Sequence, residues 1–378
     1  MPRFQFTACI FVITGVAFAV LLMSIRPYWH QYAAINTIRS AGGFVYFDHD
    51  ISTNGELMDG AGTNASFLAD LCCKPSRVEI YDVHTPSDKM TNAFSRIKGI
   101  RILNIAWSAF GDEVLQVINS PESLEVLSVR DTHISMESKD VISKMKSLRY
   151  IDLGNTKIND QMGSTLSGLS HLEDISVSGT PITDEFVDRL MPLPGLQSLD
   201  VSWTNLTDES SVNLSLLGSI ENLDLSHTKA SQRTLTVVGK LHSLKTLNLS
   251  CVISQAKDYQ RLWSLTNLVE LDLSNTKVND DSIRGIEHLK HLKHLEIGNT
   301  DVTNASLFQI GKCSSLEYIG LGGTKVNANG ILTLPRQLPL KKLDLGTMEI
   351  GDAELEMLSR RFPKCRVSVG FDSATCEE

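Results

Sequence analysis

Hydrophobic and polar residues follow one another along this chain in a pattern that returns every 24 residues. The pattern is LxxLxLxxT, and eleven copies run on without a change of phase. An unbroken period of this length indicates a repeat architecture, in which each copy is one structural unit. The copies begin at Ile100, Leu124, Leu148, Leu172, Leu196, Ile220, Leu244, Leu268, Leu292, Leu316 and Leu340.

Each copy predicts a short strand followed by a short helix. In the copy at Leu172, Ile175 and Val177 alternate with a polar residue, as in a strand with one buried face. Phe186 and Leu190 follow at helical spacing. Neither element can bury its apolar side alone, so successive copies must stack. We therefore predict an α/β solenoid with a curved, parallel concave sheet and short convex helices.

A threonine follows the strand in most copies, where its hydroxyl can satisfy backbone groups of the turn. The copy at Leu244 has Val252 at this position. We expect that turn to depart from its neighbours.

The pattern loosens toward both ends of the chain. Residues 33–38 predict a helix that stops at Gly42 and Gly43, and residues 44–47 predict a strand. Val78 and Val367 lie where a degenerate first strand and a last short strand are expected. The predicted segments are a transmembrane signal anchor (1–26), an N-terminal flanking cap and loop (27–75), the repeat array (76–363) and a C-terminal cap and tail (364–378).

The first 26 residues predict a membrane anchor. No charged residue lies between Phe4 and Ile25, and 22 residues in a helix span ~33 Å, enough to cross a bilayer core of ~30 Å. A cleaved signal peptide is the alternative, but the Ala-x-Ala at 17–19 lies inside the apolar run rather than after it. We expect a single-pass membrane protein with its repeat domain outside the cytoplasm.

Net charge and cysteine spacing limit the classes of partner and metal site that the chain can have. The formal net charge is −9, which argues against nucleic acid because phosphate backbones need clustered Lys and Arg. The seven cysteines show no CxxC spacing of a zinc site. Cys365 and Cys376 either bridge the C-terminal end or remain free thiols. Neither a cofactor nor a metal is expected.

With these repeats, the chain resembles the leucine-rich-repeat superfamily, and in particular bacterial membrane-anchored arrays built on LxxLxLxxTxI[TN]D. The units LRYIDLGNTKIND from Leu148 and LVELDLSNTKVND from Leu268 are close to that form, and the resemblance runs from Val78 to Val369. It implies protein or glycan binding on the concave sheet. It supplies no catalytic residue, because members share a scaffold and differ in surface residues.

The concave face carries the candidate binding residues. A central column of strand residues is acidic, which favours a basic partner, although solvated Asp at this position is the alternative interpretation. Rings in the flanking columns are typical interface anchors, although they can also simply shield the sheet. The predicted binding residues are Tyr150, Asp200, Trp203, Asp224, His227, Asp272, Glu296 and Tyr318.

Two other groups of residues resemble a catalytic site and a metal site. His227 and Cys251 fall at the same place in consecutive copies, as a base and a nucleophile would, but a flat sheet offers no oxyanion hole. His288, His291 and His294 alternate with core leucines, so they are expected on a solvated face rather than around one metal ion.

The sequence thus favours a membrane-tethered binding protein that is not an enzyme. The alternatives are a structural envelope or spacer protein without a specific ligand and, remotely, a cysteine hydrolase at Cys251.

Overall fold

The apolar positions of the repeat form the strands and helices that the period predicts. The computed structural model describes residues 29–47, 75–190 and 193–370. The chain divides into unit 1, Met1–Leu148, and unit 2, Arg149–Glu378.

Unit 1 opens with the helix, glycine stop and strand that the sequence predicts. Residues 29–40 are helical, and Gly42 then takes a left-handed φ of 86°. The first strand pairs antiparallel with the second, whereas the later strands are parallel. Val78 pairs with Leu103, which confirms a first coil offset by 25 residues. The elements are β1 (Phe44–Phe47), β2 (Pro75–Glu79), α3 (Asp88–Phe94), β3 (Ile102–Asn104), α4 (Asp112–Gln116), η2 (Pro121–Ser123), β4 (Val126–Ser128), η3 (Met136–Ser138) and α5 (Lys139–Ile142).

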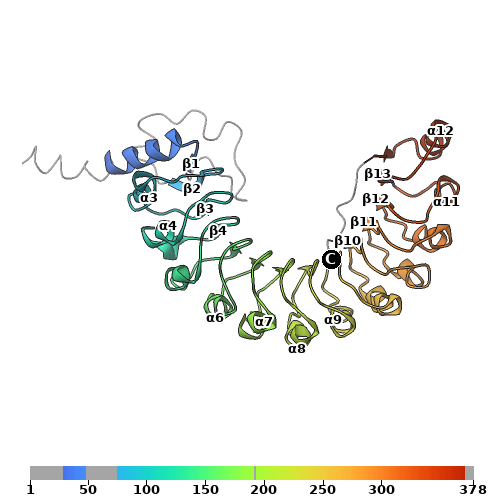
Figure 1. Ribbon diagram of the computed structural model, residues 1–378, viewed down its shortest axis with the longest axis horizontal. Coiled ribbons are helices and arrows are strands. Elements are labelled where there is room, and N and C mark those ends of the chain that lie inside the picture. The colour runs from blue at the N-terminus through green and yellow to red at the C-terminus, as the bar shows by residue number, and fades with distance from the viewer. Residues whose placement is uncertain (1–28, 48–74, 191–192, 371–378) are drawn as a thin grey trace, which may run out of the picture. The chain divides into compact units, whose positions relative to one another are not determined.

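The described residues of unit 2 stack ten parallel strands, β5 to β14, in sequence order. Leu199 pairs with Leu223 and Leu223 with Leu247, so neighbouring strands are 24 residues apart. Figure 1 shows the strands of this unit on the inner side of the coils and the helices on the outer side. Leu343 pairs with Val367, which confirms the last short strand.

The strands of unit 2 are β5 (Tyr150–Asp152), β6 (Asp174–Ser176), β7 (Ser198–Asp200), β8 (Asn222–Asp224), β9 (Thr246–Asn248), β10 (Glu270–Asp272), β11 (His294–Glu296), β12 (Tyr318–Gly320), β13 (Lys342–Asp344) and β14 (Arg366–Ser368). Its helices are α6 (Gln161–Ser167), α7 (Asp184–Leu190), η4 (Asp208–Ser210), α8 (Ser211–Leu214), α9 (Gln232–Val238), η5 (Ala256–Ser264), η6 (Ile286–His288), η7 (Asn304–Ser306), α10 (Leu307–Ile310), α11 (Ala328–Ile331) and α12 (Asp352–Arg361).

The turn after each strand is closed by the recurring threonine. In the coil of β7, the Thr204 hydroxyl donates to the carbonyl of Val201 at 2.6 Å, and the threonines of the other coils repeat this bond. The hydroxyl therefore caps its own turn. At Val252 the bond is lost, and the hydroxyl of buried Tyr259 donates instead to the Val252 carbonyl at 2.6 Å. This coil departs from the others as expected, with the 3₁₀ helix η5 on its outer side.

Aspartates near the helix starts form hydrogen bonds to the next coil. We call this series of bonds the aspartate ladder. The Asp208 carboxylate accepts the backbone N–H groups of Ser231 and Thr234, at 2.7 and 3.0 Å, and both of their hydroxyls. Asp184 does the same for Thr207, and Asp280 for Thr303. Each carboxylate thus satisfies N–H groups that open the next coil's helical segment.

No helix within the three described ranges is long and apolar enough to cross a membrane. The anchor predicted at 1–26 lies outside the described residues and stays a prediction.

Candidate functional site

Three consecutive coils of unit 2 place residues other than Asn and Gly where the backbone is left-handed. The φ angles of Trp203, His227 and Cys251 are 55°, 53° and 60°. The same position holds Asn155 and Gly179 in preceding coils, residue types that tolerate this conformation. For a bulky side chain the conformation costs about 1–3 kcal/mol, and such strain clusters at functional sites.

The hydrogen-bond ladder between coils holds these three residues in place. The N–H of Trp203 donates to the Ser226 carbonyl at 2.9 Å, and that of His227 to the Ser250 carbonyl at 3.0 Å. The N–H of Cys251 continues the series in the next coil. Because the ladder fixes the backbone, the side chains project from fixed positions at the end of each strand.

The Trp203 and His227 rings form a stacked pair. Their centroids lie 3.5 Å apart with 13° between the planes. His227 is half-buried, and burial lowers its pKa, although the nearby Asp272 carboxylate opposes the shift. Trp203 is 59% exposed. Its equivalent in the preceding coil is Gly179, and the side-chain oxygen of Asn155 occupies the space over that glycine. His227 therefore supports one face of the indole, and much of the ring remains exposed.

The acidic column is present beside this pair, in the predicted register. Asp200 pairs with Asp224, and Asp272 pairs with Glu296. Their carboxylates also stabilise the turns that follow the strands. The Ser202 N–H donates to Asp200 at 3.0 Å, and equivalent bonds recur at the other three. The column is thus half-buried and partly hydrogen-bonded, not simply solvated as the alternative interpretation supposed.

Asp224 is the most affected carboxylate near the rings. Burial raises its pKa, and the charge of neighbouring Asp200 adds to the shift, while hydrogen bonds from Ser226 and Asn248 oppose it. The Asn248 amide donates to it at 2.8 Å. A cationic ligand group near this pair would relieve the repulsion between the two carboxylates.

The ring and hydroxyl of Tyr318, in the second ring group, already contact other side chains of the protein. Its ring stacks on His294 at 3.9 Å, and the Lys342 ammonium lies 5.0 Å from its centroid. Its hydroxyl donates to Glu296 at 2.7 Å, and the Glu296 pKa is raised, mainly by burial. Tyr318 therefore has a partner in each neighbouring strand and offers less to a ligand than Trp203 does.

Tyr150 is not part of the Trp203 cluster. It is the first residue of β5, whereas Trp203 follows the end of β7, two strands or ~10 Å further along the ladder. The two predicted anchors are therefore not side by side, in agreement with their expected places in different columns of the sheet.

The cysteine hydrolase alternative is wrong on this geometry. Cys251 lies next to His227 in the ladder, as predicted, but its sulfur is disulfide-bonded. A disulfide sulfur has no thiolate, which is the nucleophilic form. Cys365 has a free thiol, so the second of its two predicted states holds and the bridge to Cys376 does not.

The three spaced histidines do not converge. His294 lies on β11 and stacks on Tyr318, whereas His288 and His291 are exposed. Within residues 29–47, 75–190 and 193–370, no three His, Cys, Asp or Glu side chains are placed to hold a metal ion.

Comparisons with known proteins agree with this architecture. Two leucine-rich-repeat family models match residues 122–182 and 195–214. The chain therefore contains leucine-rich repeats. Its fold is similar to that of an internalin from Listeria monocytogenes, with a TM-score of 0.55 and 17% identity over 81% of this chain and 91% of that one.

A leucine-rich-repeat protein of Leptospira interrogans is also similar, with a TM-score of 0.53 and 18% identity over 76% of this chain and 81% of that one. At such identities the likeness concerns the fold. No curated protein sequence matches the chain significantly. The leucine-rich-repeat fold suggests a role in protein interaction.

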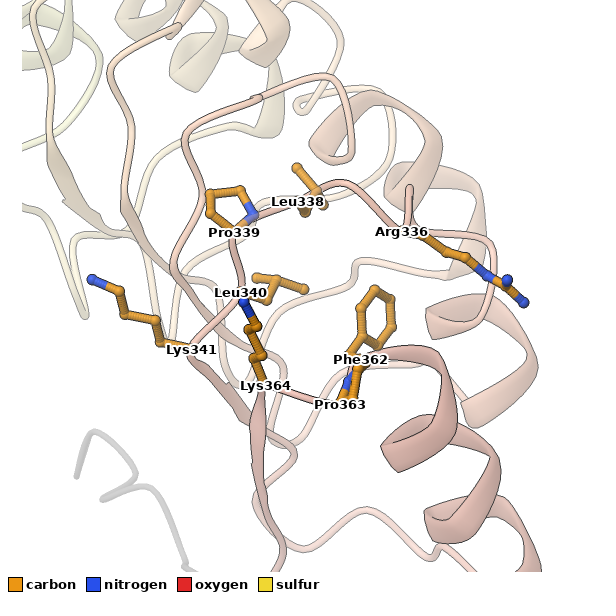
Figure 2. A pocket seen from close by; sticks show the side chains of 8 residues that line it. All are labelled: Arg336, Leu338, Pro339, Leu340, Lys341, Phe362, Pro363 and Lys364. Carbon is orange, nitrogen blue, oxygen red and sulfur yellow. The ribbon is translucent and has the colours of Figure 1, made fainter.

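A cavity of about 520 Å³ near the C-terminal end is a second candidate site. Figure 2 shows Phe362 turned toward the cavity and Lys364 reaching across it to Leu340. Arg336 and Lys341 extend away from it, and Lys341 pairs with Glu317. The cavity is mainly an opening between core residues of the last two coils, with a single cation directed inward.

Sequence reasoning missed two features of the repeat protein. The left-handed backbone at Trp203 could have been inferred from Asn155, Gly179 and Asn275, which mark the same position in other coils. The aspartate ladder could have been inferred from the 24-residue spacing of Asp184 and Asp208.

Proposed function

We propose that this repeat protein binds a macromolecular partner on the concave face of unit 2, with Trp203 and His227 at the centre of the contact. The observation that carries the proposal is an exposed, ring-supported indole held in a strained backbone conformation. A strained residue persists only where its surroundings hold it, and such positions favour function. Large aromatic anchors also dominate binding energy at interfaces.

The chemistry of the surroundings favours a basic group on the partner. A Lys or Arg side chain over the exposed part of the indole gains a cation–π contact, worth ~0.5–2 kcal/mol depending on how far the cation is desolvated. Asp200 and Asp224 lie on the adjoining strands and add a negative field. A protein that presents a basic loop fits this surface best, and a glycan stacked on the indole is the second candidate ligand.

The stacked pair also lowers the cost of binding. His227 supports one face of Trp203, so the indole loses little side-chain freedom when a partner docks. A lone exposed tryptophan would have to be ordered at that moment.

We further propose that the chain is held at a membrane by residues 1–26, with the repeat domain outside the cytoplasm. The uncharged run from Phe4 to Ile25 supports this. A structural spacer without a specific ligand is the alternative, and it gives Trp203 no special role.

The test compares two tryptophans with the same backbone conformation. Trp107 in unit 1 has a φ of 60° and is 56% exposed. Full-length chain in detergent is immobilised, and capture of partners is quantified for Trp203→Ala, Trp107→Ala and the outer-face pair Asp188→Ala and Arg189→Ala. Trp203→Ala should weaken capture by ~2 kcal/mol, about 30-fold, while the other variants leave it unchanged.

Two results would contradict the proposal. If Asp188→Ala and Arg189→Ala abolish capture while Trp203→Ala retains it, the helical side is the interface. If no partner is retained by the wild-type chain above a denatured control, the spacer alternative stands.

A further inference from the structure

The last coil of unit 2 departs from the repeat at the repeat's first position. The eleven copies of LxxLxLxxT all begin with Leu or Ile, and the last of these residues, Leu340, is buried. The residue 24 positions later is Lys364, which is exposed. A lysine ammonium stays in water unless it is paired, so Lys364 cannot fill the space that a core leucine fills. A space therefore remains beside Leu340 where the regular coils have a leucine or isoleucine.

This space is the cavity of about 520 Å³ in Figure 2. Two segments form its walls, one before β13 and one between α12 and β14, and they contribute Leu338, Pro339, Leu340, Phe362 and Pro363. Leu338, Leu340 and Phe362 are buried. The cavity thus has apolar walls, and its volume lies within the range of ~300–1,000 Å³ that is usual for ligand sites.

Cationic side chains surround the apolar walls, and one of them reaches over these walls. Figure 2 shows the Lys364 side chain crossing the cavity toward Leu340, whereas Arg336 and Lys341 extend away from it. Lys341 is paired with Glu317, but Lys364 forms no ion pair with another described residue. An unpaired ammonium therefore lies beside an apolar surface, in a chain whose formal net charge is −9.

A ligand that uses both properties must be apolar at one end and anionic at the other. An inorganic anion would pair with Lys364 but leave the apolar walls uncovered, and an alkane would cover the walls but offer no charge to the ammonium. We propose that this cavity binds a free medium-chain fatty acid. Its chain lies against Leu338, Leu340 and Phe362, where burial of each methylene is favourable. Its carboxylate accepts charge-assisted hydrogen bonds from the Lys364 ammonium.

The volume of the cavity indicates the length of the chain. A water molecule occupies ~30 Å³ of the liquid, and a methylene group is of similar size, so decanoate, with ~12 non-hydrogen atoms, occupies ~360 Å³. This volume fits within the cavity of about 520 Å³. Chains much longer than ~15 carbons would extend into solvent.

The cavity is separate from the proposed partner surface. Trp203 follows β7, and the cavity lies beside the starts of β13 and β14. β13 is six strands from β7, or ~29 Å along the sheet. Binding of a fatty acid therefore goes beyond the proposed function and can be tested without a partner.

Photolabelling of the full-length chain in detergent tests the site. The probe is decanoate with a diazirine near the end of its chain, and tryptic peptides are quantified after irradiation at increasing probe concentrations. Labelling should saturate on the peptides that contain Leu338, Leu340 and Phe362, and unlabelled decanoate should displace the probe. Micelles take up the same share of probe in every sample, so protein variants are compared at equal free concentrations.

Lys364→Gln removes the charge at an exposed position. It should weaken binding of the decanoate probe ~10-fold, the effect of losing a hydrogen bond between charged groups. Decanol has the same chain and no charge, so its inhibition constant should be the same for wild type and Lys364→Gln. Lys341→Gln is the matched control: Lys341 also lines the cavity, but it extends away and is paired with Glu317. It should change probe binding by less than ~2-fold.

Leu338→Trp fills the cavity and should abolish saturable labelling, with urea unfolding used to check that each variant is folded. Labelling of the wild-type chain that does not saturate would mean that Lys364 only makes the end of the array polar. Decanol that competes as well as decanoate on wild type, or equal losses in Lys364→Gln and Lys341→Gln, would show that the Lys364 ammonium does not hold the carboxylate. Each of these results would overturn the proposal, and none depends on partner capture.

Discussion

Replacing Asp208 tests whether the aspartate ladder holds neighbouring coils together. Its carboxylate accepts three backbone N–H groups, from Ser231, Arg233 and Thr234, and two hydroxyls. Thr234 is fully buried, so its N–H has no access to water once the acceptor is removed. Asp208→Ala should therefore lower the free energy of unfolding by ~2 kcal/mol, the upper end of the effect of losing an N-cap.

Asp208→Asn separates the charge from the shape. Asn304 fills the same role natively, accepting the Asn327 N–H at 3.0 Å, so an amide fits the ladder. Asn retains one acceptor oxygen and loses the charge, and we expect it to lower the free energy of unfolding by ~1 kcal/mol.

The pH dependence identifies the charged form as the stabilising one. Burial alone would raise the pKa of Asp208, but hydrogen bonds from Ser231 and Thr234 outweigh it and lower the pKa from 3.8 to about 2. Because the folded-state pKa is lowered, the contribution is complete above pH ~4 and is lost as the pH falls toward 2. After discounting for solvent screening of this partly exposed group, it amounts to ~1 kcal/mol.

Urea unfolding of wild type and Asp208→Asn between about pH 2.5 and 6 measures this contribution. The difference between them should shrink as the pH falls. Glu209→Gln is the matched control, because Glu209 is exposed and its ion pair is with exposed Arg233. A difference that stays constant with pH, or a control that loses as much stability as Asp208→Asn, would refute the capping argument.

Three further predictions concern the core, the strained backbone and the acidic column. Leu223→Ala should lower the free energy of unfolding by ~2–5 kcal/mol, because Leu223 is only 2% exposed. Leu216 is 59% exposed, so Leu216→Ala should change the free energy of unfolding by less than ~0.5 kcal/mol. Equal urea midpoints for the two variants would mean that the register is wrong. Trp107→Asn should raise the free energy of unfolding by ~1 kcal/mol, because Asn tolerates the left-handed backbone; a lower value would show that Trp107 makes stabilising contacts. Reversing the charge of Asp200 and Asp224 should slow association of a basic partner and flatten its salt dependence in surface plasmon resonance, whereas an unchanged salt slope would exclude electrostatic steering.

Much of the fold could be predicted because burial dictates the period. Leu199, Leu223 and Leu247 recur every 24 residues, and each pairs with the next in adjacent strands. A shift by one residue would turn their side chains to the opposite face, so the leucines alone specify the register. Val252 likewise predicted the altered turn, because valine lacks the hydroxyl that closes the turns of the other coils.

The candidate site was harder to predict because its residues break the local rule. Left-handed positions are normally recognised by Asn or Gly, and Trp203, His227 and Cys251 are neither. The position of the acidic column was predicted correctly. Its hydrogen bonds were not predicted, because strand periodicity does not specify side-chain geometry: Asp200 and Asp224 each accept the N–H group two residues later.

The grouping of strained residues in adjacent coils bears on why the array tolerates them. In a solenoid each coil contacts only its neighbours, so strain at Trp203 and His227 must be balanced within one or two coils. The next coil is reinforced by elements that the regular repeat lacks: buried Tyr259 closes its turn, and the Trp263 indole N–H donates to the Ser282 carbonyl at 2.8 Å. The disulfide at Cys251 lies in that same coil. These additional interactions lie in the coil next to the strained Trp203–His227 pair. This arrangement is expected if the pair is retained for binding and the adjoining coil offsets the free-energy cost of its strained backbone.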